Sequence, residues 1–203
     1  MNRTVFLKKD LVEKFGDQVT VSQVFSGIEN DFRSIDEVVC QFKLNNMALD
    51  EGGEMRLSKS LVTEIETLEV LSQKPSQILS EIVINWMTKI PMMIEQTDNL
   101  SSNIRFQGIE GHLKTLVTLI DDCQLLIDSI LSIDSAFQQV PFVQSQDWKK
   151  GQSQMADGVG EALDAFQKKD FTRLADVLEY DLGHFLQSWF EILSRLQASL
   201  KDS

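Results

Sequence analysis

From Pro75 to the end of the chain, apolar residues recur at the three- and four-residue spacing of helices, which constrains the fold more than any other feature. Pro75 suits the first turn of a helix, and Pro91 is expected to kink that helix. Pro141 separates two later helical segments. The predicted class is therefore mainly α, with an antiparallel four-helix bundle over residues 75–203.

The segment 106–130 gives the clearest helical signal, because its apolar residues step by three and four in alternation. This heptad seam consists of Phe106, Ile109, Leu113, Leu116, Ile120, Cys123, Ile127 and Ile130. Such a seam needs a partner helix at a shallow crossing angle. The partner is either another helix of this chain or a second copy, and the sequence does not distinguish the two.

Two further helices complete the predicted bundle. One covers residues 148–168, with Asp147 as its expected cap. The last helix begins after Asp170, whose side chain is expected to cap it, and runs nearly to the end of the chain.

Residues 1–74 have a mixed pattern that predicts a small α+β module, a helix plus a β-hairpin. The capping box Thr20–Gln23 begins the helix. Residues 38–44 alternate between two faces, and Asn45–Asn46 provides turn residues after them. The stretch DEGGE, residues 50–54, is expected to be a flexible loop. Further strands are expected at residues 4–7 and 64–70.

The charge balance restricts the class of partner. The chain has 19 Lys and Arg against 31 Asp and Glu, a formal net charge of −12, without a basic stripe. Contacts with nucleic acid or with anionic lipid depend on basic side chains, so both partners are excluded. No stretch approaches the roughly 18 apolar residues of a membrane span, and the N-terminus carries no signal-peptide pattern. A cytoplasmic protein is expected.

The two cysteines support that compartment. Cys40 and Cys123 lie in apolar surroundings, without a CxxC pair or a Cys/His group. We therefore expect two buried thiols, as is typical of proteins in a reducing environment.

One stretch resembles a metal site in composition: LADVLEYDLGHFLQSWF, residues 174–190. A helical wheel places its core stripe on Phe171, Leu174, Leu178, Leu182, Phe185, Trp189, Ile192 and Leu196. The opposite face carries Asp176, Tyr180, His184 and Glu191, with Arg173, Gln187 and Ser194. Asp181-x-x-His184 has half the spacing of a di-iron motif, but His112, the only other histidine, has no carboxylate three residues before it. The outward face is predicted to be a solvated or protein-contacting surface without a metal.

The sequence also lacks the residues that other kinds of catalytic or binding site require. With two histidines in separate segments, no Ser-His or Cys-His pair is indicated, and the glycines form no phosphate-binding motif. We therefore predict no catalytic residue, no cofactor and no metal ligand.

Large apolar residues near the end of the chain are candidates for partner binding. Leu186, Phe190 and Leu193 widen the apolar arc of the last helix beyond what one neighbouring helix covers. Phe142 and Trp148 lie in or beside the Pro141 loop, where they either cap the bundle or contact a partner.

These observations favour a non-enzymatic protein-interaction module, an adaptor or a chaperone-like helical bundle that binds another protein or a second copy of itself. In being helical and acidic the chain is similar in kind to small bacterial chaperones and adaptors of secretion and flagellar systems, although no motif carries that likeness. The alternative is a ligand-binding or enzymatic bundle with a pocket between the N-terminal module and the helices.

Overall fold

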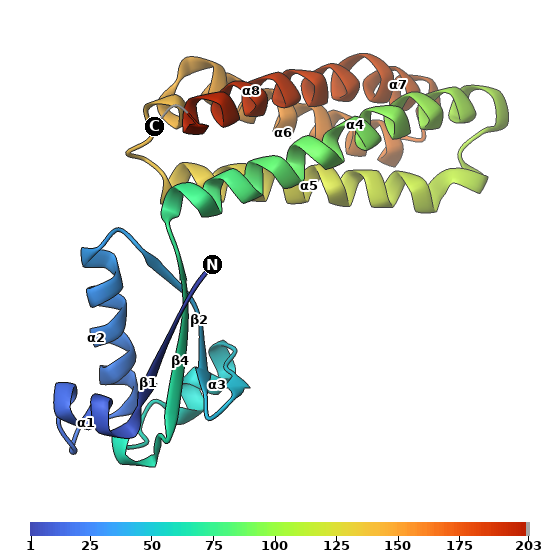
Figure 1. Cartoon of the computed structure of the whole chain (residues 1–203). Helices are drawn as coiled ribbons and strands as arrows, with labels where there is room; N and C mark the ends of the chain where they lie inside the picture. The colour runs from blue at the N-terminus through green and yellow to red at the C-terminus, as the bar shows by residue number, and fades with distance from the viewer. Residues whose placement is uncertain (202–203) are drawn as a thin grey trace. The chain divides into compact units, whose positions relative to one another are not determined.

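The computed structural model describes residues 1–201 and shows a mainly helical chain, 74% helix, as predicted. It divides into two compact units, Met1–Ile78 and a second that begins at Leu79 (Figure 1). The first is a four-stranded antiparallel sheet with short helices, and the second is the helical bundle. Among residues 1–201, the helices lack the combination of length and apolar character that a membrane span requires.

The sheet of the first unit has the strand order β1-β4-β2-β3. The strands are β1 (Asn2–Leu7), β2 (Val38–Leu44), β3 (Met47–Ala48) and β4 (Thr67–Gln73). The predicted hairpin is confirmed: β2 and β3 pair antiparallel, and Asn45 and Asn46 between them have φ of 50° and 68°. Asparagine tolerates this left-handed conformation, so the pair forms the turn.

Short helices pack beside the sheet. They are α1 (Lys8–Phe15), α2 (Val21–Ser34), α3 (Glu51–Leu57) and the 3-10 turn η1 (Val62–Glu64). The capping box of α2 is confirmed, since Thr20 N donates to Gln23 Oε1 at 2.9 Å and Gln23 N donates to Thr20 Oγ1 at 3.3 Å. Phe25 of α2 stacks on Phe42 of β2 with ring centroids 4.1 Å apart, which joins helix and sheet in one core.

Two expectations for this unit are wrong. The DEGGE stretch forms most of α3 rather than a loop, because Asp50 caps it by accepting a 2.6 Å hydrogen bond from Gly53 N. Cys40 is exposed rather than buried. The β2–β4 register shifts between Val39 and Gln41, so strict alternation fails at Cys40 and its thiol turns outward.

The bundle consists of four helical segments, of which consecutive ones run in opposite directions (Figure 1). They are α4 (Pro75–Gln107), α5 (Leu113–Ala136), α6 (Gln146–Gln167) and a last segment made of α7 (Phe171–Asp176), the π-helix η4 (Val177–Leu182) and α8 (Gly183–Lys201). The 3-10 turns η2 (Glu110–His112) and η3 (Pro141–Gln144) lie in the connections.

The heptad seam packs within the chain, since Leu116, Ile120, Cys123 and Ile130 belong to the bundle core. Its predicted beginning is wrong. Phe106 is the penultimate residue of α4 and is 87% exposed, because Gly108, with φ of 80°, ends that helix before α5 starts.

The helix starts were predicted with mixed success. Asp170 caps α7 as expected, accepting a 3.0 Å hydrogen bond from Arg173 N. The cap of α6 is Ser145 rather than Asp147: its hydroxyl accepts from Trp148 N at 3.3 Å, and Asp147 lies in the first turn.

Candidate functional site

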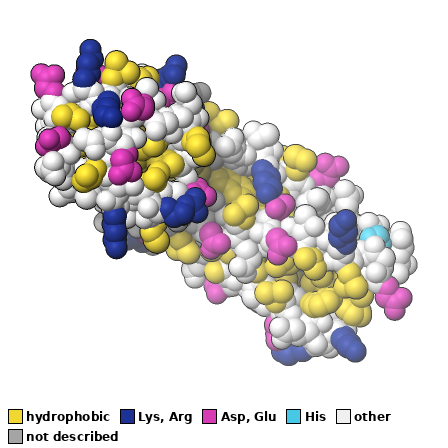
Figure 2. Space-filling view, turned by 90° about the horizontal axis from the view of Figure 1, so that it is seen from below, with side chains coloured by type: hydrophobic (Ala, Val, Ile, Leu, Met, Phe, Trp, Pro, Cys, Tyr) yellow, Lys and Arg dark blue, Asp and Glu magenta, His cyan; other side chains and the backbone are white. Residues whose placement is uncertain are grey.

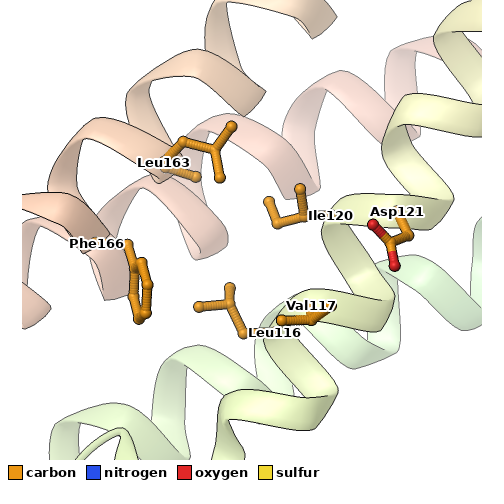
Figure 3. Close-up of a pocket in the computed structure, with 7 residues that line it drawn as sticks. Leu116, Val117, Ile120, Asp121, Leu163 and Phe166 are labelled. Atoms are coloured by element: carbon orange, nitrogen blue, oxygen red, sulfur yellow. The ribbon is translucent and has the colours of Figure 1, made fainter.

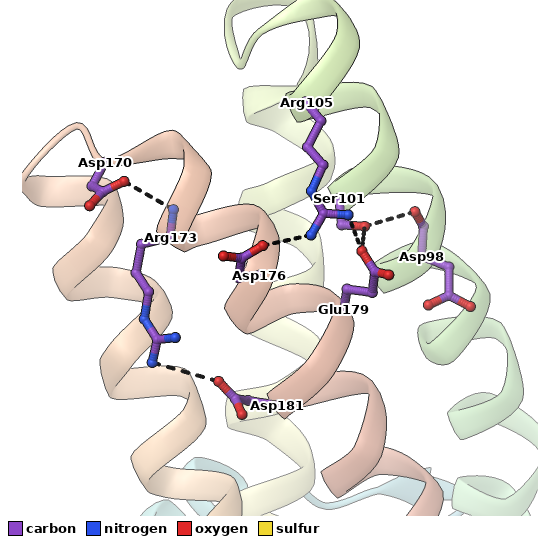
Figure 4. A network of polar contacts seen from close by, with 8 residues as sticks. All are labelled: Asp98, Ser101, Arg105, Asp170, Arg173, Asp176, Glu179 and Asp181. Carbon is purple, nitrogen blue, oxygen red and sulfur yellow. Dashed lines mark hydrogen bonds and ion pairs between the residues drawn. The ribbon is translucent and has the colours of Figure 1, made fainter.

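The acidic residues of the 174–190 stretch are used in ion pairs with two arginines. Arg105, near the end of α4, reaches between Asp176 and Glu179; its Nη2 lies 2.7 Å from Asp176 Oδ1, and its Nη1 donates to Glu179 Oε2 (Figure 4). The hydroxyl of Ser101 donates to the same Glu179 oxygen at 3.3 Å. The guanidinium also lies over the Tyr180 ring, 5.8 Å from its centroid.

These contacts shift the ionisation of the pair. The Arg105 hydrogen bond holds the pKa of the Glu179 carboxyl below its ordinary value, against the opposing effect of burial. The hydrogen bonds to Asp176 and Glu179 raise the pKa of Arg105 further above its ordinary value. Both groups are therefore charged at neutral pH, and the cluster ties α4 to the π-helix.

Arg173 uses the remaining carboxylate of the stretch. It donates to Glu161 of α6. Its Nη2 also lies 3.8 Å from Asp181 Oδ2 (Figure 4). His184 lies outside both clusters, exposed on α8. Within the part of the chain that the structure describes, no group of three or more His, Cys, Asp or Glu side chains is arranged to hold a metal ion.

The π-helix marks the point where the last segment passes Thr97 of α4. A Cβ at Gly183 would lie 3.4 Å from Thr97 Oγ1, so the two backbones approach closely there. π-Helical turns are frequent at functional sites. Here both carboxylates of the turn, Glu179 and Asp181, are in ion pairs, which gives this stretch a structural explanation.

A second feature of the bundle is an apolar groove between α5 and α6, with a volume of about 210 Å³. Leu163 and Phe166 of α6 face Leu116 and Ile120 of α5 across it (Figure 3). The full lining is Leu116, Val117, Ile120, Asp121, Ala162, Leu163 and Phe166. Val117 is 57% exposed and Leu163 38% exposed, so apolar surface continues from the groove to its rim.

The charges around this groove are acidic. Asp121 is the one ionisable group among the lining residues described, and it belongs to α5. On α6, Asp157, Glu161 and Asp164 line a second surface hollow, where Arg173 pairs with Glu161 and Lys168 pairs with Asp164 at 2.7 Å. Figure 2 shows hydrophobic side chains gathered on the surface of the bundle, with acidic and basic side chains beside them.

The residues predicted to bind a partner lie elsewhere. Leu186, Leu193 and Trp148 are at most 1% exposed and belong to the bundle core. The Trp148 and Trp189 rings meet edge to face, with centroids 5.1 Å apart. The wide apolar arc of α8 is therefore covered within the bundle core.

Phe190 and Phe142 are half-buried and pack against the same core. Arg195 covers the Phe142 ring at 5.9 Å from its centroid. Trp148 is thus part of the bundle core, and Phe142 packs against that core beneath Arg195.

Sequence reasoning did not single out the groove. Val117 and Leu163 are large apolar residues that lie beside, not on, the periodic stripes of their helices. An apolar side chain off the stripe is the signal that could have revealed it.

Comparisons with known proteins place the helical region in a family. Residues 81–192, more than half of the chain, match the model of the family described as "Domain of unknown function (DUF8042)". Neither a curated protein nor a solved structure matches the chain.

Proposed function

This chain belongs to the DUF8042 family, and we propose that its bundle is a non-enzymatic adaptor or chaperone-like module whose α5–α6 groove binds an apolar helix of a partner protein. One observation carries the proposal: an apolar groove between two helices in which Asp121 is the one ionisable group among the lining residues described. It resembles the grooves that receive the apolar face of an amphipathic helix.

The shape of the groove favours a short helical anchor. Its lining spans residues 116–121 of α5 and 162–166 of α6, between one and two turns of each helix. A partner helix would place one or two large side chains against Leu116, Ile120 and Phe166. Val117 and Leu163 would then contact the sides of that anchor, and their exposed apolar surface would be buried on binding.

The charges favour a basic partner over a second copy. Asp121 lies at the groove, and Asp157 lies on the outer face of α6, where Glu161 and Asp164 already pair with Arg173 and Lys168. A helix with Lys or Arg beside its apolar face complements them. A second copy of a chain with net charge −12 would instead bring acidic rims together, which disfavours pairing through this groove.

The composition of the groove supports binding rather than catalysis. Apart from Asp121, its described lining residues have hydrocarbon side chains. Acid–base or nucleophilic chemistry needs at least a second polar group in reach of the first.

We also assign the adaptor to the cytoplasm. The support is chemical: both cysteines are thiols, one exposed on β2 and one buried in α5, as is usual in a reducing compartment.

The test uses two synthetic amphipathic helical peptides with the same leucine face, one flanked by lysine and one by glutamate. Fluorescence anisotropy should detect binding of the lysine peptide and weaker binding at high salt. Val117→Glu should weaken it by about tenfold or more, which corresponds to roughly 1.4 kcal/mol. Leu125→Glu is the matched control, because Leu125 is 53% exposed on α5 but does not line the groove.

Equal effects of Val117→Glu and Leu125→Glu, or preference for the glutamate peptide, would contradict the proposal. Sedimentation of the free protein tests the other occupant. If the chain is a dimer that Val117→Glu converts to monomers, the groove holds a second copy instead of a foreign helix.

A further inference from the structure

We infer that the bundle binds a structural water molecule between the last turn of α5 and the first turns of α6, bridging Asp134, Trp148 and Gln152. Three side-chain atoms there are buried: Asp134 Oδ1, Trp148 Nε1 and Gln152 Nε2. None of them has a hydrogen-bond partner among the described residues. The inference does not depend on the proposed function.

Buried polar atoms without partners are costly, and native proteins keep few of them. Within the described part of the chain, these three are the buried side-chain atoms without a hydrogen-bond partner, and all of them lie on α5 and α6. Trp148 is fully buried, so its indole N–H cannot reach bulk solvent.

The helix register brings the three groups to one place. In the groove, Leu116 of α5 faces Phe166 of antiparallel α6 (Figure 3). Asp134 follows Leu116 by 18 residues and Trp148 precedes Phe166 by 18, which is five full turns in each helix at about 3.6 residues per turn. Asp134 therefore repeats the position of Leu116, and Trp148 that of Phe166, at the other end of the helix pair.

Gln152 completes the group. It lies four residues after Trp148, on the same face of α6 and one turn further along. Side chains lean towards the N-terminus of their own helix, so those of Gln152 and Asp134, on antiparallel helices, lean towards each other.

The donors and the acceptor fit water. Trp148 Nε1 and Gln152 Nε2 donate, and a water oxygen accepts two hydrogen bonds; Asp134 Oδ1 accepts one from the water. Three protein partners is the usual number for a buried water. The Asp134 carboxylate would repel an anion, and the two N–H donors would repel a metal ion. Neither ligand therefore fits these three groups.

Bound there, the water would join the two helices at the connection that contains η3. This end of the α5–α6 pair is opposite to the groove, and the water would fix the spacing of the helices without using a side-chain contact between them.

The test is NMR spectroscopy of the full-length ¹⁵N-labelled protein. The indole Nε1–H signal of Trp148, assigned with Trp148→Phe, should show NOE and ROE cross-peaks to a long-lived water. Trp189 is the internal control, since its Nε1–H donates to Gly151 O at 3.2 Å and should show none. Absence of the cross-peak at Trp148 would overturn the inference.

A variant distinguishes a cross-peak that arises from the bound water from one that arises from exchangeable protons nearby. Asp134→Leu should abolish the cross-peak at Trp148 while the Trp189 signal keeps its position. If Asp134→Leu does not fold, Gln152→Met serves the same purpose and should weaken the cross-peak at least twofold. A cross-peak that persists unchanged in a folded variant would show that these side chains do not hold the water.

Discussion

The indole N–H of Trp189 donates a buried hydrogen bond of 3.2 Å to the main-chain oxygen of Gly151, and the same ring lies against the α-carbon of that glycine. A Cβ built on Gly151 would be 3.0 Å from Trp189 Cζ2 and 3.2 Å from Ile192 Cδ1. Helices α6 and α8 therefore approach as closely as a glycine permits. A larger residue would have to displace a fully buried tryptophan.

Gly151→Ala should therefore destabilise the bundle by roughly 1–3 kcal/mol through overpacking, although alanine favours helix over glycine by about 1 kcal/mol. Gly160→Ala on the same helix is the control, because nothing lies within 4 Å of the added Cβ. It should stabilise by about 0.5–1 kcal/mol. Urea unfolding followed by tryptophan fluorescence measures both, since Trp86, Trp148 and Trp189 all lie in the bundle. Stabilisation by both changes would show that α6 and α8 are not tightly packed.

Glu179 makes the bundle's stability depend on pH in a definite direction. Its pKa is below the ordinary 4.5 in the folded protein, chiefly because Arg105 hydrogen-bonds its carboxylate. The stabilisation is therefore complete above about pH 4.5 and is lost as the pH falls through the folded value. The difference in urea midpoint between the parent and Glu179→Gln should shrink from about pH 6 to about pH 3. Glu95→Gln, at an exposed position of α4, controls for the general effect of losing a carboxylate.

The two cysteines should differ in reactivity. Burial raises the pKa of the Cys123 thiol to about 12, with a further contribution from Asp122, whereas Cys40 is exposed. The thiolate is the reactive form, so a thiol reagent at about pH 8 should modify one cysteine per native chain and both in denaturant. Cys40→Ser should remove the native reaction. Rapid native modification in that variant would mean that α5 opens readily.

The outward face of the last segment should tolerate change. His184→Ala alters an exposed residue and should shift the free energy of unfolding by no more than about 0.5 kcal/mol. Leu178→Asp should prevent folding, because it places a charge at a fully buried position. Elemental analysis of the parent should find no stoichiometric transition metal, and a metal lost in His184→Ala would refute this assignment.

Periodicity predicted the long helices well because burial imposes it. Leu174, Leu178, Leu182 and Trp189 lie on the predicted stripe, and all are buried. Residue types with a strong local preference also gave correct predictions: the Asp170 cap and the Asn45–Asn46 turn. These features depend on neighbours only a few residues apart.

Contacts between distant residues could not be predicted in this way. Arg105 and Glu179 are 74 positions apart, and nothing in either segment identifies its partner. The same applies to the sides of α8: Leu186 and Leu193 seemed surplus to one neighbouring helix, but helix packing in three dimensions covers them. Helix α1 was missed because it buries a single residue, Leu11, and so shows little periodicity.

The register shift in β2 has a practical consequence. It turns the thiol of Cys40 outward in the first unit, while every tryptophan belongs to the second. The unmutated chain therefore already contains a donor set in one unit and a single attachment point for an acceptor dye, Cys40, in the other. The efficiency of energy transfer from the tryptophans to the dye would then report on the distance between the two units. It can be measured while a candidate helix is titrated into the groove.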